Sequence, residues 1–254
     1  MWIRLDKLLS DSGCGSRSEV RRTIRGGRVK VDGEAVLDTG RRVDTGCQSV
    51  AVDGRAVDCS PFHYLMLHKP EGVVSATEDP SLPTVLSLLP PRYQRIGLFP
   101  VGRLDRDATG LLLLTNDGSF AHEMTAPGKE IPRIYEATAD IPIKPAMPKA
   151  FALGLTLPDG TVLKKAILAP DSLNPLRARV TIFEGKYHQV KRMFAVFGLT
   201  VVKLKRLSHG LLELDPGLAP GAWRPLSDAE RSLIHTDSTQ FICKHYTKSA
   251  NNLC

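Results

Sequence analysis

Residues 102–118 read GRLDRDATGLLLLTNDG, so four consecutive leucines stand between a charged segment and a turn. An apolar run of this length, followed by Asn116-Asp117-Gly118, is typical of a buried strand that ends in a turn. Residues 102–110 are then the loop that enters the strand, and a loop anchored to a buried strand is rigid enough to carry catalytic residues. Asp105 and Asp107 are therefore candidate carboxylates, although a carboxylate beside arginines is more often a structural ion pair.

A second segment, residues 184–206, favours the catalytic interpretation. It reads EGKYHQVKRMFAVFGLTVVKLKR, with six Lys or Arg residues and no acidic residue after Glu184. Apolar residues at i, i+3, i+4 and i+7 predict a helix with one buried face, closed by Gly198. These residues are Val190, Met193, Phe194 and Phe197. Residues 202–205 then alternate apolar and basic side chains, which predicts a half-buried strand with a basic outer face.

Three motifs in this order resemble those of a known enzyme family. Gly102-Arg103-Leu104-Asp105 with residues 110–113 looks like the GRLDxxTxGLLLLTNDG signature of pseudouridine synthases of the small-subunit RsuA branch. Residues 184–194 are similar to that family's EGRYHQVKRMF motif, and residues 69–75, KPEGVVS, to its KPxGxxxS motif. With the N-terminal segment described below, the resemblance covers nearly all of residues 2–234.

The resemblance implies a site and a chemistry. Asp105 matches the family's essential aspartate and Lys191 its basic partner, while Tyr135, within Arg133-Ile134-Tyr135, matches the tyrosine that stacks on the target base. RNA contacts are expected from Arg103, Lys186, His188, Gln189 and Arg192. Pseudouridine formation moves the glycosidic bond from N1 to C5 with no net change in atoms, so the resemblance implies no cofactor and no metal. The aspartate can serve as nucleophile, electrostatic stabiliser or proton acceptor, and the sequence leaves these roles open.

Single residues in this set also have simpler interpretations. Tyr135 alone is typical of a core aromatic with a bonded hydroxyl, and Lys191 of a solvent-facing lysine. Asp107 is expected to cap or pair locally, because the family pattern leaves its position variable. The sequence departs from the pattern at His68 (asparagine expected), at Ala108 (threonine expected, so a loop hydroxyl is missing) and at Arg133 (lysine expected). Because Asp105 and its two partners remain, activity is expected.

The N-terminal segment predicts a small helix-hairpin domain that binds RNA. Residues 4–12 have helical spacing, Ser16 to Glu19 form a capping box that begins a second helix, and Gly26-Gly27 end that helix. Asp32-Gly33 and Asp53-Gly54 each predict a hairpin turn. The segment resembles the S4 RNA-binding domain. Its basic residues, expected to follow phosphates if the helix carries through, are Arg17, Arg21, Arg22, Arg25, Arg28 and Lys30. A merely solvated helix face is the alternative.

Composition favours a nucleic-acid partner in a reducing compartment. The net charge is +7, which favours a polyanionic partner. The 5 cysteines are odd in number and form no CxxC pair, which argues against a disulfide framework and favours the cytoplasm. No apolar run reaches the roughly 20 residues of a membrane helix. His235, Cys243, His245 and Cys254 match no zinc spacing. We therefore expect a monomer whose partner is ribosomal RNA or the pre-ribosomal small-subunit particle, without membrane or metal.

The predicted fold class is α+β. Residues 1–60 form the S4-like domain, residues 61–234 a pseudouridine synthase domain with a mixed, mainly antiparallel sheet flanked by helices, and residues 235–254 a polar, disordered tail. The predicted function is isomerisation of a specific uridine in small-subunit (16S) ribosomal RNA. Three alternatives remain open: a large-subunit enzyme of the same family, a non-enzymatic S4-type ribosome-binding or assembly factor, and a nucleosidase that releases uracil.

Overall fold

The computed structural model describes residues 2–233 and divides them into two compact units. The first unit contains Met1–His63 together with Leu86–Phe99, and the second contains Tyr64–Val85 and the chain from Pro100 onward. The sequence predicts one boundary, after residue 60, and does not predict the return of residues 86–99 to the first unit. The predicted tail, 235–254, with its four His and Cys residues, lies outside the described residues. Across residues 2–233, every helix is too short or too polar to cross a lipid bilayer.

The first unit has the predicted pair of helices and two hairpins. Helix α1 spans Leu5–Asp11 and α2 spans Arg17–Arg25, and the predicted capping box at Ser16 and Glu19 is present. A four-stranded sheet has the order β3-β2-β5-β6, beside a two-stranded β1-β4 pair. The strands are β1 (Trp2–Arg4), β2 (Val29–Val31), β3 (Glu34–Ala35), β4 (Arg42–Asp44), β5 (Val50–Val52) and β6 (Arg55–Ala56). Both predicted turns have positive φ at the aspartate and the glycine, as two-residue hairpin turns require.

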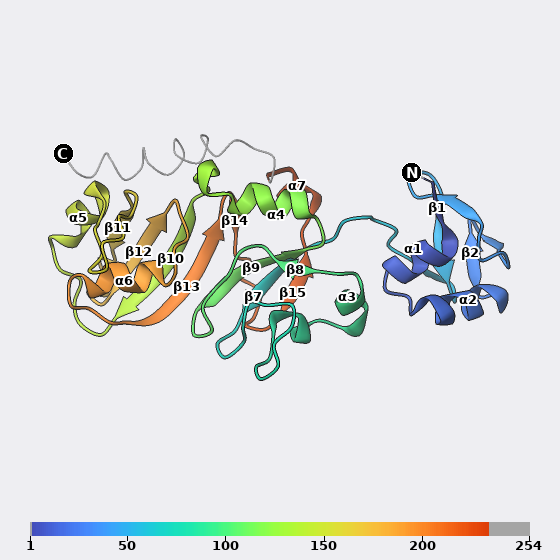
Figure 1. Cartoon of the computed structure of the whole chain (residues 1–254), viewed down its shortest axis with the longest axis horizontal. Helices are drawn as coiled ribbons and strands as arrows, with labels where there is room; N and C mark the ends of the chain where they lie inside the picture. The colour runs from blue at the N-terminus through green and yellow to red at the C-terminus, as the bar shows by residue number, and fades with distance from the viewer. Residues whose placement is uncertain (1, 234–254) are drawn as a thin grey trace. The chain divides into compact units, whose positions relative to one another are not determined.

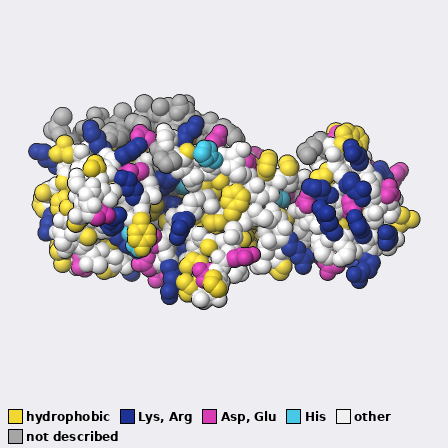
Figure 2. Space-filling model, in the orientation of Figure 1, with side chains coloured by type: hydrophobic (Ala, Val, Ile, Leu, Met, Phe, Trp, Pro, Cys, Tyr) yellow, Lys and Arg dark blue, Asp and Glu magenta, His cyan; other side chains and the backbone are white. Residues whose placement is uncertain are grey.

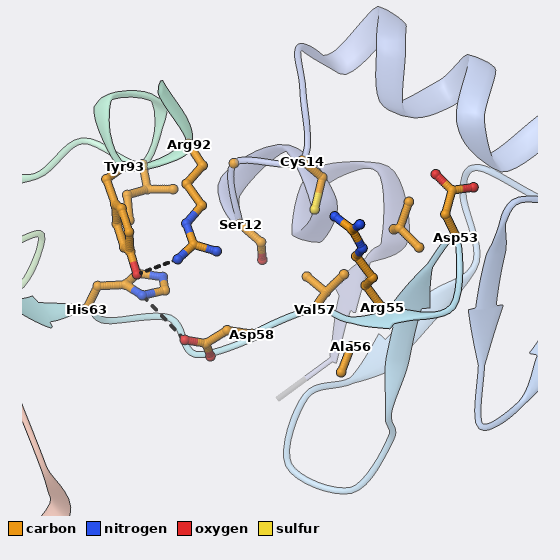
Figure 3. A pocket seen from close by; sticks show the side chains of 13 residues that line it. Ser12, Cys14, Asp53, Arg55, Ala56, Val57, Asp58, His63, Arg92 and Tyr93 are labelled. Carbon is orange, nitrogen blue, oxygen red and sulfur yellow. Dashed lines mark hydrogen bonds and ion pairs between the residues drawn. The ribbon is translucent and has the colours of Figure 1, made fainter. Parts of the chain in front are cut away.

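The returning segment of the first unit holds α3 (Pro91–Arg95), between η1 (Val85–Leu88) and β8 (Phe99–Pro100). Its backbone lies so close to the turn after α1 that a Cβ atom on Gly13 would stand 2.6 Å from the Arg92 carbonyl oxygen. A pocket opens beside this contact, and Figure 3 shows Arg92 and Tyr93 reaching into the same hollow as Arg55 and Val57. The glycine is therefore required where two distant parts of the chain meet.

The second unit is built on one mixed sheet, as predicted (Figure 1). The strand order is β11-β12-β10-β13-β9-β7-β15, with β14 paired to β13. The β13–β9 pairing is parallel and the other pairings on this path are antiparallel. The strands are β7 (Tyr64–Lys69), β9 (Thr109–Thr115), β10 (Arg133–Ala139), β11 (Ile167–Pro170), β12 (Arg177–Ile182), β13 (Val201–His209), β14 (Leu212–Glu213) and β15 (Trp223–Pro225).

The leucine run forms the centre of this sheet. Strand β9 carries Leu111 to Leu114, which are all at most 1 % exposed, so the strand is buried on both faces as predicted. One face packs on α4 (Gly118–Thr125) through Phe120 and Met124. The remaining helices are η2 (Pro127–Lys129), α5 (Met147–Leu153), α6 (Gln189–Ala195) and α7 (Asp228–Leu233). Helices α5 and α6 pack together through an edge-to-face pair of Phe151 and Phe194.

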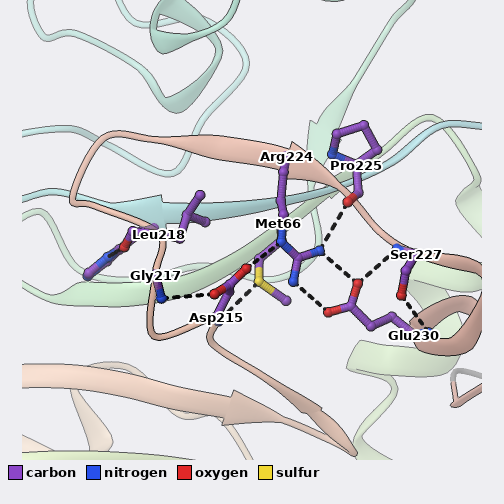
Figure 4. Close-up of polar contacts among 9 residues, drawn as sticks. Met66, Asp215, Gly217, Leu218, Arg224, Pro225, Ser227 and Glu230 are labelled. Atoms are coloured by element: carbon purple, nitrogen blue, oxygen red, sulfur yellow. Dashed lines mark hydrogen bonds and ion pairs between the residues drawn. The ribbon is translucent and has the colours of Figure 1, made fainter.

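An ionic cluster ties the last strand to the last helix. Arg224 donates from Nε to Asp215 (2.7 Å) and from both terminal nitrogens to Glu230 (2.7 and 2.8 Å), as Figure 4 shows. Glu230 also accepts the backbone N–H of Ser227, and its own N–H bonds to the Ser227 hydroxyl, so the two residues form a capping box at the start of α7. This cluster fixes α7 against β15.

Candidate active site

The loop that carries Asp105 is held by the KPEGVVS segment. Lys69, at the end of β7, is fully buried, and its ammonium donates to the carbonyl oxygens of Pro70 (2.9 Å), Arg106 (3.2 Å) and Ala108 (2.9 Å). The buried Ser75 hydroxyl bonds both to the carbonyl oxygen and to the N–H of Leu104 (2.9 and 3.0 Å). These side chains therefore fix the backbone on both sides of Asp105.

Burial also changes the pKa of Lys69, the side chain that holds the loop. It lowers this pKa to about 8, while the negative charges of Asp107 and Asp105 partly oppose the shift. The missing hydroxyl at residue 108 does not leave the loop open, because the N–H of Ala108 bonds to the Asp105 carbonyl oxygen (3.1 Å). The Ala108 side chain is fully buried. Alanine thus closes the turn by packing and backbone bonding.

Gly110 lets the loop join the sheet. It has φ +104°, and a Cβ atom there would lie 2.2 Å from the backbone oxygen of Arg206. That close approach is the start of the parallel pairing between β9 and β13, in which Gly110 lies opposite Arg206. Any side chain at residue 110 would push the two strands apart and displace the loop.

Asp105 lies in an ionic cluster with Lys191, as the resemblance implies. The Lys191 ammonium, on α6, is 3.1 Å from one Asp105 carboxylate oxygen and 2.5 Å from an Asp107 carboxylate oxygen. Burial opposes the charge of Lys191, but its bonds to the two aspartates outweigh this effect and raise its pKa. The same bond from Lys191 lowers the pKa of Asp107. Asp107 thus pairs with a residue distant in sequence, and the expected local pairing is wrong.

His188 contacts the other oxygen of the same carboxylate. Its Nε2 atom is 3.5 Å from Asp105 Oδ1, and the residue directly precedes α6 with a left-handed backbone, φ 48° and ψ 34°. Left-handed conformations are uncommon for non-glycine residues and persist where the surroundings hold them. The predicted RNA contact His188 is therefore placed against the aspartate itself, with Lys191 one helical turn further on.

Tyr135 is brought near the loop by the register of three strands. On β10 it lies opposite Arg206 of β13, which in turn lies opposite Gly110 of β9. Neighbouring strands are about 4.8 Å apart, so Tyr135 stands roughly 10 Å from the end of the Asp105 loop along the sheet. The residue is 7 % exposed, so its side chain is almost entirely buried.

The predicted RNA contacts of the second unit differ in accessibility. Arg103 is exposed beside Asp105. Lys186 donates to the Val162 carbonyl oxygen, and Arg192 pairs with Asp159. Gln189 is 4 % exposed; its side-chain oxygen accepts the backbone N–H of Lys186 and its side-chain nitrogen donates to Glu184. The side chain therefore holds the turn at the start of α6 and offers almost no surface to RNA.

In the first unit the predicted basic residues are exposed. Arg17, Arg21, Arg22 and Arg25 all lie on α2, and Lys30 lies on β2. Figure 2 shows Lys and Arg side chains gathered on the face of this unit that is turned to the viewer. Arg21 also pairs with the buried Asp6 (3.1 Å). The helix ends at Arg25, so Arg28 does not continue the predicted stripe and pairs with Asp53 instead.

The sequence motifs did not identify Lys69 and Ser75 as the supports of the loop that carries Asp105. Their motif was visible, but a motif does not show which backbone its side chains will bond. The available signal was a lysine two residues after the apolar run Leu65–Leu67, where burial of an ammonium requires several acceptors.

Comparison with known proteins adds independent findings. Residues 63–196 match the family model described as RNA pseudouridylate synthase, and residues 3–48 match the S4 domain. A Bacillus subtilis protein named an uncharacterized RNA pseudouridine synthase is 45 % identical over 236 residues, which are 92 % of this chain and 98 % of that protein. The ribosomal small subunit pseudouridine synthase A of Pseudomonas aeruginosa is 43 % identical over 230 residues, 90 % and 98 % of the two chains. A crystal structure of a pseudouridylate synthase aligns with a TM-score of 0.64 and 34 % identity, covering 91 % of this chain and 99 % of that one.

Proposed function

The chain belongs to the RNA pseudouridylate synthase family, and from this premise we propose that it converts a uridine of small-subunit ribosomal RNA to pseudouridine. The observation that carries the proposal is the contact of Asp105 with Lys191 on a loop clamped by Lys69 and Ser75. The choice of small-subunit RNA is supported by relatives of that name that align over almost their whole length.

The reaction has demands that this site can meet. The bond between N1 and C1′ breaks, the uracil turns, C5 bonds to C1′, and the proton on C5 leaves while N1 gains one. A carboxylate beside the sugar can attack C1′ or stabilise positive charge there, and can then accept the C5 proton. We assign this work to Asp105, because its carboxylate is one-quarter exposed and is contacted by side chains alone.

Three further residues complete the proposed site. Lys191 orients the Asp105 carboxylate by a charge-assisted contact from the adjacent helix. We assign Tyr135 to the uracil, which must leave its stack before the glycosidic bond can react. Because Tyr135 is 7 % exposed, this role requires its ring to be uncovered when the RNA binds. We assign the RNA backbone to Arg103, and its exposure on the same loop supports this role.

The first unit supplies the RNA-binding part of the proposal. It holds the S4 match and the exposed arginines of α2, and these cations suit a structured RNA whose phosphates they would neutralise. A cytoplasmic location belongs to the same proposal and is supported by the ribosomal RNA substrate. The monomeric state is proposed with it as the expectation from the sequence.

Mapping of pseudouridine by carbodiimide treatment and primer extension tests the proposed function. Ribosomal RNA is taken from cells that lack the protein and from the same cells rescued with wild type or with Asp105→Asn. We expect one small-subunit stop that disappears on deletion and returns with wild type alone.

The other outcomes separate the alternatives. A stop confined to the large subunit would transfer the assignment to the large-subunit enzymes. An unchanged map in both subunits would favour a binding or assembly factor, and release of free uracil from the RNA would indicate a nucleosidase.

A further inference from the structure

Tyr187 is an exposed aromatic residue with no part in the site described so far. Its side chain is 75 % exposed, although it stands in the turn that leads into α6 and immediately precedes His188. Scattered exposed apolar residues are common, but an exposed tyrosine next to a catalytic carboxylate has a more specific meaning when its ring is held in place.

The Tyr187 ring is held from one side by His188. The two rings are stacked, with centroids 3.8 Å apart and an interplanar angle of 17°. His188 in turn lies 3.5 Å from Asp105 and has the left-handed backbone described above. Because one face of Tyr187 is covered and three-quarters of the side chain remains exposed, the opposite face is open to solvent.

The backbone around Tyr187 is also fixed. The amide of Gln189 bonds to the N–H of Lys186 (3.0 Å) and to Glu184 (3.2 Å), and the N–H of Gln189 bonds to the Lys186 carbonyl oxygen (3.1 Å). These bonds close a turn around residues 186–189. The ring is therefore presented by a rigid segment, so little conformational entropy is lost when a ligand stacks on it.

From this arrangement we propose that Tyr187 and His188 form a stacking platform for a nucleobase that directly flanks the target uridine. An open aromatic face beside cationic side chains is the feature by which proteins bind single-stranded RNA without reading its sequence. Arg192, which donates to the Tyr187 carbonyl oxygen (3.5 Å), and Lys186, the preceding residue, supply cationic charge nearby, although each also has an acidic partner, Asp159 and Glu184 respectively. The inference rests on the proposed function, because the uridine at Asp105 defines which base is the neighbour.

His188 links the Tyr187 ring to Asp105, and this link limits which part of the RNA can stack on the ring. His188 spans the gap between the Tyr187 ring and the carboxylate, with one stacking contact and one 3.5 Å contact. Stacked bases are about 3.4 Å apart, so the platform lies within reach of a neighbouring nucleotide and not of a remote part of the RNA. When the uridine leaves its stack, the flanking base loses a stacking partner, and Tyr187 replaces it.

The test uses a short single-stranded RNA with one uridine and the fluorescent base 2-aminopurine on its 5′ or 3′ side. We compare wild type with Tyr187→Ala, with Tyr187→Phe, which keeps the ring, and with Leu173→Ala, which removes another exposed apolar side chain of the second unit. Stacking quenches 2-aminopurine. We expect quenching with wild type, Tyr187→Phe and Leu173→Ala, and its loss with Tyr187→Ala, together with RNA binding roughly 5- to 100-fold weaker.

Turnover on ribosomal RNA gives a second readout. Tyr187→Ala should raise KM more than it lowers kcat, since the ring does not touch the reacting atoms, and Tyr187→Phe should restore KM. Equal quenching by wild type and Tyr187→Ala in both flanking positions overturns the platform. Failure of the proposed function looks different, because wild type then makes no pseudouridine, while the fluorescence still reports whether the ring at residue 187 matters.

Discussion

The clusters around Arg224 and Lys191 in the second unit each join one cation to two carboxylates, but they are built in opposite ways. In the cluster of Arg224, the guanidinium donates to Asp215 and grips Glu230 with both terminal nitrogens. Each carboxylate also accepts a backbone N–H, from Gly217 and from Ser227 respectively. This saturation is what a structural ion pair needs, because every lone pair left without a donor weakens it.

The cluster of Lys191 leaves its central carboxylate much less occupied. Within residues 2–233, Asp105 is contacted by the side chains of Lys191 and His188, at 3.1 and 3.5 Å, and by no backbone N–H. The fixed hydrogen bonds lie in the backbone beneath it, through Lys69 and Ser75. Hydrogen bonds to the backbone therefore fix the position of Asp105, while each of its carboxylate oxygens is contacted by one side chain of the described residues.

The largest expected effect that tests this difference is that of Asp105→Asn. The amide has the same shape but cannot attack C1′ or take the C5 proton, so we expect the isomerisation rate to fall by at least about 1000-fold. RNA affinity should stay within a few fold. Release of tritium from RNA labelled at C5 of uridine measures the rate under single-turnover conditions. Full turnover by Asp105→Asn would refute the assignment.

Lys191→Met should have the next largest effect. Methionine keeps most of the side-chain volume but removes the cation that orients Asp105, so we expect kcat to fall roughly 10- to 100-fold with a smaller change in KM. Lys191→Arg is the matched control, because it keeps the charge and should recover part of the rate. If Lys191→Met were as active as wild type, the contact would be incidental to catalysis.

Local sequence patterns predicted the elements that carry these clusters. The leucine run predicted β9, the Ser16 and Glu19 pattern predicted the start of α2, and the Asp-Gly pairs predicted both hairpin turns. Each depends on residues a few positions apart, where periodicity and capping rules apply. The same holds for the family motifs, which pointed to Asp105, although only the structure shows what surrounds it.

What the sequence did not reveal depends on contacts across long separations. Arg206 stands in a basic run but is 1 % exposed, because it reaches the Leu111 carbonyl oxygen across the β9–β13 pairing. Val202 fits a buried alternation yet is 56 % exposed. Tyr187 carries no signal of stacking at all. Burial and aromatic contacts are set by which elements meet, and neither periodicity nor spacing contains that information.

The third largest effect is expected from Arg224→Met, which removes the cation of the Arg224 cluster and should change the free energy of unfolding and its pH dependence. Arg224 lowers the pKa of Glu230 to about 2, below its usual 4.5. A depressed carboxyl pKa contributes stability that is complete above the unfolded-state value and is lost as the pH falls through the folded one. Arg224→Met should therefore lower the free energy of unfolding by about 2 kcal/mol at pH 7, and this difference should shrink between about pH 4.5 and pH 2.

Thermal unfolding of wild type and Arg224→Met at several pH values measures this effect. At pH 7 the folded variant should retain the wild-type turnover rate, because Arg224 lies outside the cluster of Asp105. A difference in melting temperature that stayed constant down to pH 2 would show that Glu230 does not carry the effect.

The smallest effect is expected from Asp107→Asn, and it separates the two carboxylates that share Lys191. Asp107 is 70 % exposed on its side chain, so its bond to Lys191 is screened by water and contributes little. Removal of this negative charge leaves the Lys191 ammonium paired with Asp105, and we expect kcat within about threefold of wild type. A loss as large as that of Asp105→Asn would mean that both carboxylates take part in catalysis. The Lys191 cluster would then differ from the Arg224 cluster in its geometry, and not in having one carboxylate with few hydrogen bonds.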